Sequence, residues 1–145
     1  MAKQLYVVGV DGSQWSERAA DRAIKLAAQT GAEVSLVYAF DYNSGNPLAT
    51  RGIIPETLDK DAEEQNIMQS ILQPMIDKAA SPSVNVTAVV LWGEPVDKIH
   101  DYVKAAKASM VFVGRRGRSR FADLILGSVA NKLAHYSGIP VVLVP

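Results

Sequence analysis

The chain lacks cysteine altogether: none of its 145 residues carries a thiol. Disulfide frameworks, thiolate metal sites and cysteine nucleophiles are therefore excluded. An excess of charge of one sign is also missing, because 15 lysine and arginine residues balance 15 aspartate and glutamate residues. No net field draws the protein toward nucleic acid or an anionic membrane, so we expect neither as a partner.

Long apolar runs are missing as well. No segment approaches the roughly 18–20 unbroken apolar residues of a membrane-spanning helix, and the run Leu5 to Val10 is too short for the core of a signal peptide. The two histidines, His100 and His135, have no partner at the spacing of metal ligands. We therefore expect a soluble, cytoplasmic protein without membrane insertion and without a histidine-based metal site.

Apolar strands alternate with amphipathic helices along the chain. The predicted strands cover residues 5–10, 34–40, 84–92, 110–113 and 141–144. Helices are predicted between them, from Trp15 to a stop at Gly31, across 58–79 with a break near Gln73 caused by Pro74, after Pro95, and over 128–137 before Gly138. Because parallel strands need crossover connections, this order predicts a single α/β domain over residues 1–145, with a mostly parallel five-stranded sheet and helices on both faces.

Glycines mark the loop after the fourth predicted strand. Gly114-Arg-Arg-Gly117 leaves the strand, and Gly127-Ser128 follows at the start of a predicted helix, which gives the spacing G-x2-G-x9-G-S. Glycine lets the backbone approach a ligand closely, and a helix N-terminus offers free N–H groups to a phosphate. The alternative is that these glycines are only turn residues.

Four arginines in the same loop favour phosphate binding. They are Arg115, Arg116, Arg118 and Arg120, and guanidinium groups form paired, charge-assisted hydrogen bonds with phosphate oxygens. Some of them can instead pair with carboxylates such as Asp123 in a solvated basic loop. We include Arg116, between the first two glycines, among the candidate contacts.

These features together resemble the universal stress protein family, in its small ATP-binding, single-domain branch. The resemblance rests on the glycine spacing, on Val10-Asp-Gly-Ser13 after the first strand and on the closing run Ile139-Pro-Val-Val-Leu-Val144, and it extends from Leu5 to Val144. The fold that it implies is a Rossmann-like, adenine-nucleotide-hydrolase-like sheet of strand order 3-2-1-4-5. The first and fourth strands would then lie side by side at the switch point.

The resemblance also implies a nucleotide site. Val10, Asp11 and Ser13 match the first nucleotide-contacting segment of the family, where the aspartate lies near the ribose or a bound divalent ion such as Mg²⁺ or Mn²⁺. Ala39 matches a backbone contact to adenine. For Asp11, a cap on the first helix is the alternative role.

The remaining implied contacts belong to the fourth strand and the glycine loop. The ribose would lie beside Val113 and Gly114. The phosphates would lie beside the other implied contacts, which are Gly117, Gly127, Ser128 and Val129. The implied ligand is ATP.

The leading interpretation is a stress-response regulator that uses an adenine nucleotide as a switch to control the binding of a protein partner. A slow ATP hydrolase or another nucleotide-dependent enzyme of the same fold is the alternative. Fast ATPase chemistry is not expected, because the chain has no Gly-x4-Gly-Lys-Ser/Thr segment. A receiver domain would need an aspartate where Leu91-Trp92-Gly93 stands, and a flavodoxin-like carrier would need more hydroxyls than the loop after Val10 contains.

The last predicted strand suggests self-association. No charged side chain lies between Ile139 and Pro145, and the implied strand order places this strand at a sheet edge, where unpaired backbone groups invite another chain. Two copies of one strand can pair across a two-fold axis. We therefore predict a homodimer built on Val141 to Val144, the alternative being that Pro145 and the preceding helix shield a short edge.

Overall fold

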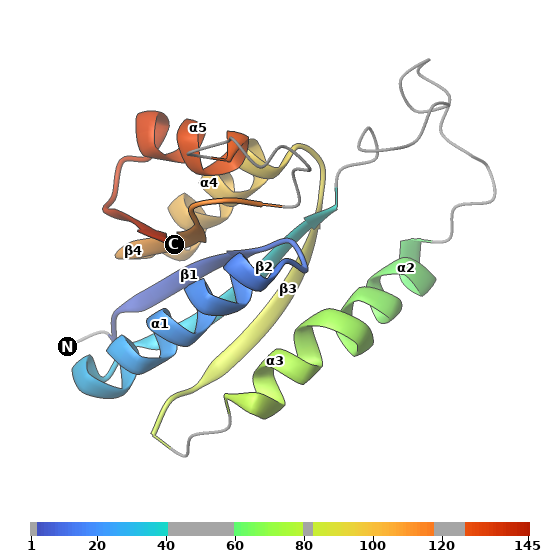
Figure 1. Cartoon of the computed structure of the whole chain (residues 1–145), viewed down its shortest axis with the longest axis horizontal. Coiled ribbons are helices and arrows are strands. Elements are labelled where there is room, and N and C mark those ends of the chain that lie inside the picture. Colours follow the sequence, from blue (N-terminus) through green and yellow to red (C-terminus); the bar gives the residue numbers. More distant parts are fainter. Residues whose placement is uncertain (1–2, 41–59, 80–82, 118–126) are drawn as a thin grey trace.

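A computed structural model describes residues 3–40, 60–79, 83–117 and 127–145. Within them, five parallel strands form one sheet in the order β3-β2-β1-β4-β5 (Figure 1). The strands are β1 (Leu5–Val10), β2 (Glu33–Phe40), β3 (Val86–Trp92), β4 (Met110–Gly114) and β5 (Val141–Val144). The predicted fold class and strand order are confirmed.

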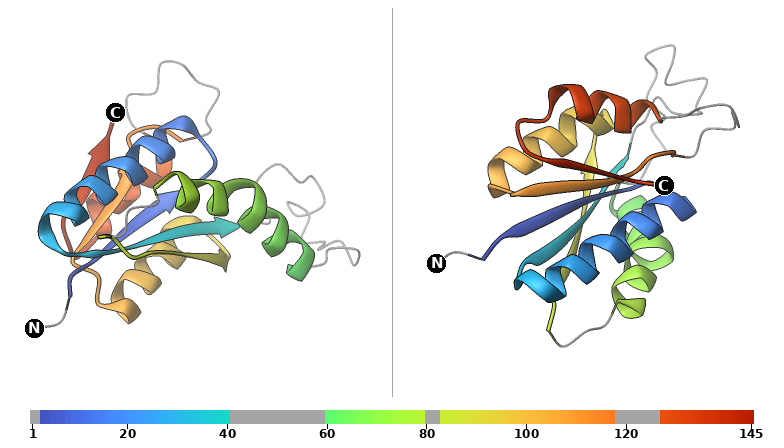
Figure 2. Two further views of the ribbon diagram at one scale, coloured as in Figure 1. Left: turned by 90° about the horizontal axis from the view of Figure 1, so that it is seen from below. Right: turned by 60° about the vertical axis from the view of Figure 1, so that its left-hand side comes forward.

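Helices cover both faces of the sheet (Figure 2). One face carries α1 (Gln14–Thr30) and a second long helical segment made of α2 (Lys60–Ile67), the π-helical turn η2 (Met68–Leu72) and α3 (Gln73–Lys78). The other face carries α4 (Pro95–Ala106) and α5 (Ser128–Tyr136). None of the helices in the described ranges is long and apolar enough to cross a membrane.

The core divides into two apolar layers because neighbouring side chains of a strand point to opposite faces. On β1, Tyr6 and Val8 are buried in the layer that contains the alanines of α1. Val7, between them, is buried in the layer that contains Ile99 of α4 and Leu133 of α5. The central strand therefore packs against both helical layers. The helices of both layers begin at the carboxyl ends of the strands.

Helix α1 has the bounds that its sequence predicts. The Ser13 hydroxyl accepts a hydrogen bond from the Ser16 N–H at 3.2 Å and caps the start. Gly31 ends the helix with a φ of 80°, in the left-handed region where glycine has no steric penalty. The side chains buried against the sheet are small, Ala19, Ala23 and Ala27 among them, so the helix axis lies close to the strands.

The second long helix is irregular at the predicted position. We expected a break near Gln73, and the structure has the π-helical turn Met68–Leu72, after which α3 begins at Gln73. The Gln73 N–H donates to the Met68 carbonyl, five residues back. Pro74 is in the first turn of α3, and because it has no N–H to donate to the turn before it, one helical bond is missing where η2 meets α3.

Helix α5 ends differently from the prediction. Gly138 is not among the described glycines with positive φ, and the helix stops at Tyr136 with Ser137 in an extended conformation. The Ser137 hydroxyl bonds both to the Ile139 N–H at 3.2 Å and to its carbonyl at 2.9 Å. The turn that starts β5 is thus closed by a serine side chain rather than by glycine.

Candidate functional site

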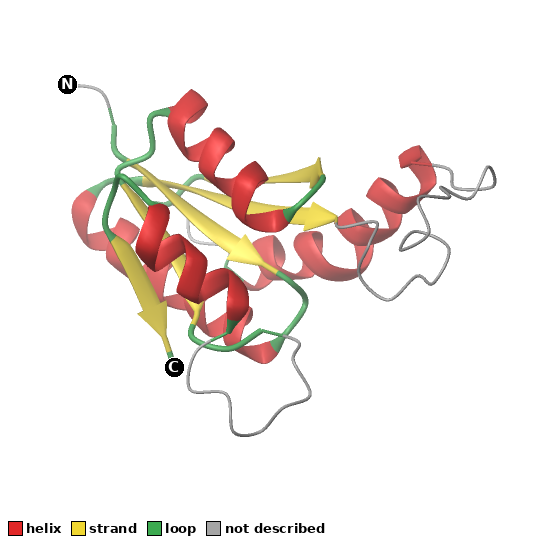
Figure 3. Cartoon of the chain, turned by 90° about the horizontal axis from the view of Figure 1, so that it is seen from above, coloured by secondary structure: helices red, strands yellow, loops and turns green. Residues whose placement is uncertain are grey.

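A cleft of about 600 Å³ lies at the carboxyl ends of β1 and β4. These two strands are neighbours in the sheet, but the chain leaves β1 toward α1 on one face and β4 toward α5 on the other; Figure 3 shows the strand ends and the loops that follow them. Diverging connections of this kind open a crevice at the switch point of an α/β sheet. Its volume lies in the range of about 300–1,000 Å³ that is typical of small-molecule sites.

The side chain of Asp11, at the end of β1, lies beside the glycine loop. Its Oδ1 accepts the Ser13 N–H at 2.9 Å, which fixes the turn before α1. Its Oδ2 points the other way, since a methyl group added at Gly117 would lie 2.8 Å from this oxygen. One carboxylate oxygen is therefore used by the fold, and the other remains at the cleft.

Ser13 does not line the cleft, although the family resemblance implies a contact there. Its side chain caps α1, as described above, and its carbonyl accepts a hydrogen bond from the Ser16 hydroxyl at 2.9 Å. Ser16, one turn into the helix and buried, lines the cleft instead. The cap of α1 is therefore Ser13 and not Asp11, the alternative considered for that aspartate.

The glycines of the loop allow three backbone segments to pack closely. A Cβ at Gly114 would lie 2.7 Å from the Cβ of Trp15, so β4 could not end this close to α1 with any other residue. The Gly127 N–H donates to the Arg115 carbonyl at 2.7 Å, and a Cβ at Gly127 would lie 3.2 Å from the Gly117 nitrogen. A side chain at position 127 would thus press on the loop itself, apart from any effect on the approach of a ligand.

The N-terminus of α5 forms one wall of the cleft. The first backbone bond of this helix joins the Asn131 N–H to the Gly127 carbonyl at 2.9 Å. The N–H groups of residues 128–130 precede that bond, and N–H groups in this position have no acceptor within their own helix. Because residues 128–130 line the cleft, the positive end of the helix dipole is available to an anion there.

Arg116 adds an unpaired donor to this wall. The side chain is half-buried, and its Nε is buried without a hydrogen-bond partner among the residues that the structure describes. Leaving a buried donor unpaired costs about 1–3 kcal/mol, and more for a charged group. An anionic oxygen in the cleft would remove this cost. Arg115 is exposed, and Arg118 and Arg120 lie outside the described residues.

The structure brings the predicted site residues together, Ser13 apart. Those that line the cleft come from the ends of three strands, from the glycine loop and from the start of α5: Val10, Asp11, Ala39, Val113, Gly114, Arg116, Gly117, Gly127, Ser128 and Val129.

Sequence reasoning missed two charged residues of the cleft, Glu94 and Lys132. Lys132 lies four residues after Ser128 on α5, and this spacing on one helix face was a usable signal. Glu94 precedes α4 and accepts the Asp97 N–H at 2.9 Å as the helix cap. Nothing in the local sequence distinguishes it from an ordinary capping residue.

The residues of the cleft could coordinate a metal ion only together with oxygen atoms of a bound ligand. Across the four described ranges, no group of three or more aspartate, glutamate or histidine side chains could hold a metal. Asp11 and Glu94 are the carboxylates among the residues that line the cleft. Mg²⁺ commonly binds one or two carboxylates together with phosphate oxygens, so these residues fit an ion that arrives with a phosphate.

The fold and the cleft together define an open α/β protein with a glycine-containing loop and a helix N-terminus at its switch point. The chain belongs to the universal stress protein family, whose model matches residues 6–145. It is 30% identical over 142 residues to universal stress protein YxiE of Bacillus subtilis, covering 95% of this chain and 96% of that protein. The family prediction made from the sequence is confirmed.

Solved structures of relatives share the fold. A universal stress protein crystallised in complex with cAMP is 28% identical, with a TM-score of 0.64 over 100% of this chain and 98% of the other. A universal stress protein from Archaeoglobus fulgidus in complex with dAMP is 23% identical, with a TM-score of 0.67 over 99% and 98% of the two chains.

Proposed function

We propose that this protein binds an adenine nucleotide in the cleft at the ends of β1 and β4. The observation that carries the proposal is the buried, unpaired Nε of Arg116, a residue that lines the same cleft as the N-terminus of α5. A guanidinium group and a helix N-terminus are both suited to phosphate oxygens. The relative crystallised with cAMP, a phosphate-bearing adenine nucleotide, supports the same class of ligand.

The cleft offers each part of the nucleotide a different surface. The phosphates would lie against Gly117, the amides of residues 128–130 and the Arg116 guanidinium, with Lys132 adding a positive charge. The ribose would lie beside Val113 and Gly114, near the free oxygen of Asp11. The base would contact the backbone of Ala39 at the end of β2. All these residues line the same cavity.

The nucleotide that we propose is ATP, with Mg²⁺ or Mn²⁺ held by Asp11 and the phosphates. ATP would act in the cytoplasm as a signal that changes the binding of a protein partner during the stress response. A single domain would carry both the nucleotide site and the partner-binding surface. We expect slow consumption, because the chain has no Gly-x4-Gly-Lys-Ser/Thr segment and so lacks the loop lysine that meets the phosphates in a P-loop ATPase.

The test is to denature the purified protein and identify any released nucleotide by mass spectrometry, and then to measure ATP, ADP, AMP and cAMP binding by calorimetry. We expect ATP to bind most tightly and phosphate release to stay far below the ~10 per second typical of enzymes. Turnover at enzyme-like rates would favour an ATP hydrolase. Failure of all four nucleotides to bind would refute the proposed ligand.

We also propose a homodimer built on β5. The Pro140 carbonyl accepts a hydrogen bond from the Val111 N–H of β4, and the Val144 carbonyl accepts one from the Arg115 N–H, directly after β4. In a parallel ladder alternate residues face the same neighbour, so the N–H and C=O groups of Val141 and Leu143 are directed away from β4, toward the free edge. Leu143 is also an exposed large apolar side chain, at 36%. These features support pairing with a second copy.

A further inference from the structure

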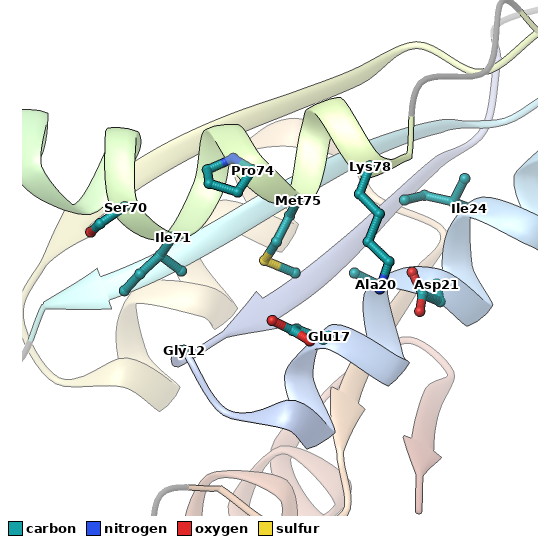
Figure 4. Close-up of a pocket in the computed structure, with 10 residues that line it drawn as sticks. All are labelled: Gly12, Glu17, Ala20, Asp21, Ile24, Ser70, Ile71, Pro74, Met75 and Lys78. Carbon is teal, nitrogen blue, oxygen red and sulfur yellow. The ribbon is translucent and has the colours of Figure 1, made fainter.

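A second, smaller cavity lies on the face of the sheet that carries α1. This groove, of about 170 Å³, runs between α1 and the segment formed by η2 and α3 (Figure 4). Its apolar lining comes from both walls, with Ala20 and Ile24 on α1 and Ile71, Pro74 and Met75 on the facing segment. Figure 4 shows Ile71 and Met75 extending from their helix toward α1. The groove shares no lining residue with the nucleotide cleft.

One side of the groove is acidic. Glu17 and Asp21, four residues apart on α1, are exposed and line it together. Lys78 reaches across from α3, and its side chain ends near Ala20 and Asp21 (Figure 4). The residues that line the groove therefore include two carboxylates and one ammonium group, which leaves a net negative rim above an apolar floor. Lys78 also shows that an ammonium group at the end of a methylene chain can reach the acidic side of the groove (Figure 4).

The size and chemistry of the groove match a single side chain. Small-molecule sites usually enclose about 300–1,000 Å³, so this groove is too small for a second nucleotide or a cofactor. An apolar floor suits the methylene stem of a long basic side chain, while an acidic rim suits its charged end. Arginine combines both and presents a planar group that binds carboxylates in pairs.

We propose that this groove docks an arginine side chain of a protein partner. The wall formed by η2 is a π-helical turn, a local irregularity that occurs frequently at functional sites. The charge of the rim and the volume of the groove select the occupant, and neither depends on what the nucleotide cleft holds. The proposal therefore goes beyond the proposed function and can fail separately from it.

The test titrates the protein, without nucleotide, with the peptide acetyl-Leu-Arg-Leu-amide and follows the methyl signals of Ile71 and Met75 by NMR. We expect saturable shifts at both methyl groups. Asp21→Asn should weaken the apparent affinity about five-fold, the effect of a partly exposed ion pair. The matched control is Asp101→Asn, because Asp101 is also exposed and helical but lies on α4, on the opposite face; its affinity should be unchanged.

Three outcomes would overturn the proposal. The first is the absence of saturable shifts at Ile71 and Met75. The second is an equal response to acetyl-Leu-Glu-Leu-amide, which would show that charge does not select the ligand. The third is a change of the same methyl signals on dilution of the protein alone, which would assign the groove to contact between two copies of the chain.

Discussion

Arg115 and Arg116 are adjacent in the chain but differ in their surroundings, and this difference gives a matched pair for mutation. Arg116→Met should weaken ATP binding at least ten-fold, or about 1.4 kcal/mol, because the bond from a charged donor to a phosphate oxygen is lost. Arg115→Met should leave affinity nearly unchanged, since that side chain is exposed. Calorimetry on both variants checks the prediction. Equal losses would show a general effect of loop charge instead.

Gly127 and Gly138 form a second pair. A Cβ at Gly127 would press on the Gly117 backbone at 3.2 Å, whereas one at Gly138 would meet nothing within 4 Å. Gly127→Val should therefore displace the loop and weaken ATP binding at least ten-fold, about 1.4 kcal/mol. Gly138→Val should bind as the parent does. Circular dichroism must confirm that each variant is folded, and unchanged affinity in a folded Gly127→Val would remove this glycine from the cradle.

Lys107 offers a test of stability rather than binding. It ends α4 with a φ of 54° and is the one non-glycine residue with positive φ among those described. The left-handed conformation costs a residue with a Cβ about 1–2 kcal/mol, while glycine gains freedom in the unfolded chain. Lys107→Gly should raise the free energy of unfolding by about 0.5–1 kcal/mol.

Urea denaturation measures this change. The control is Lys104→Gly, three residues earlier within the same helix, which should destabilise the protein by about 1 kcal/mol because glycine is a poor residue inside a helix. If both substitutions destabilise the protein equally, the conformation at residue 107 is not the reason for either effect.

At the level of helices and strands, the sequence predicted those bounds that the local periodicity of apolar residues determines. The alanines of α1 and the β-branched runs of the strands recur at the spacing of their elements, so their bounds could be predicted to within a residue or two. The π-helical turn could not, because a widened hydrogen-bond pattern has no side-chain signature other than the proline after it. The end of α5 was predicted to within one residue, but a serine side chain rather than the predicted glycine closes the turn after it.

The same limit applies to the site. The loop from Gly114 to Ser128 could be predicted from its glycine spacing, and Asp11 could be predicted from its position at the end of a strand. Glu94 was not, since only the three-dimensional sheet brings the end of β3 to the same edge as the end of β1. Charged residues that enter a site from a distant strand end cannot be found by spacing along the chain.

For the whole molecule, the free edge of β5 predicts the oligomeric state. Leu143→Lys places a charge at this edge and should convert a dimer into a folded monomer, as measured by sedimentation velocity at micromolar concentration. Val144 would be a poor choice, because it is 9% exposed and belongs to the core. Tyr136→Lys is the control, since Tyr136 is 72% exposed and belongs to α5 rather than to the strand.

A parent protein that sediments as a monomer would contradict the dimer. A Leu143→Lys variant that remains dimeric would leave the dimer in place but assign its interface to another surface. Loss of the dimer in both variants would mean that added positive charge, and not the strand edge, separates the two copies.

The turn after β1 lies between the two cavities. Asp11 lines the cleft at the ends of β1 and β4, and Gly12, the next residue, lines the groove, where an added Cβ would lie 3.4 Å from the Cδ1 of Ile71. Any ligand that displaces this turn from one side changes the surface on the other. Linkage is reciprocal: if a nucleotide tightens the groove for its occupant by some factor, the occupant must tighten the cleft for that nucleotide by the same factor. Retention of nucleotide by this protein would then depend on which partner is bound.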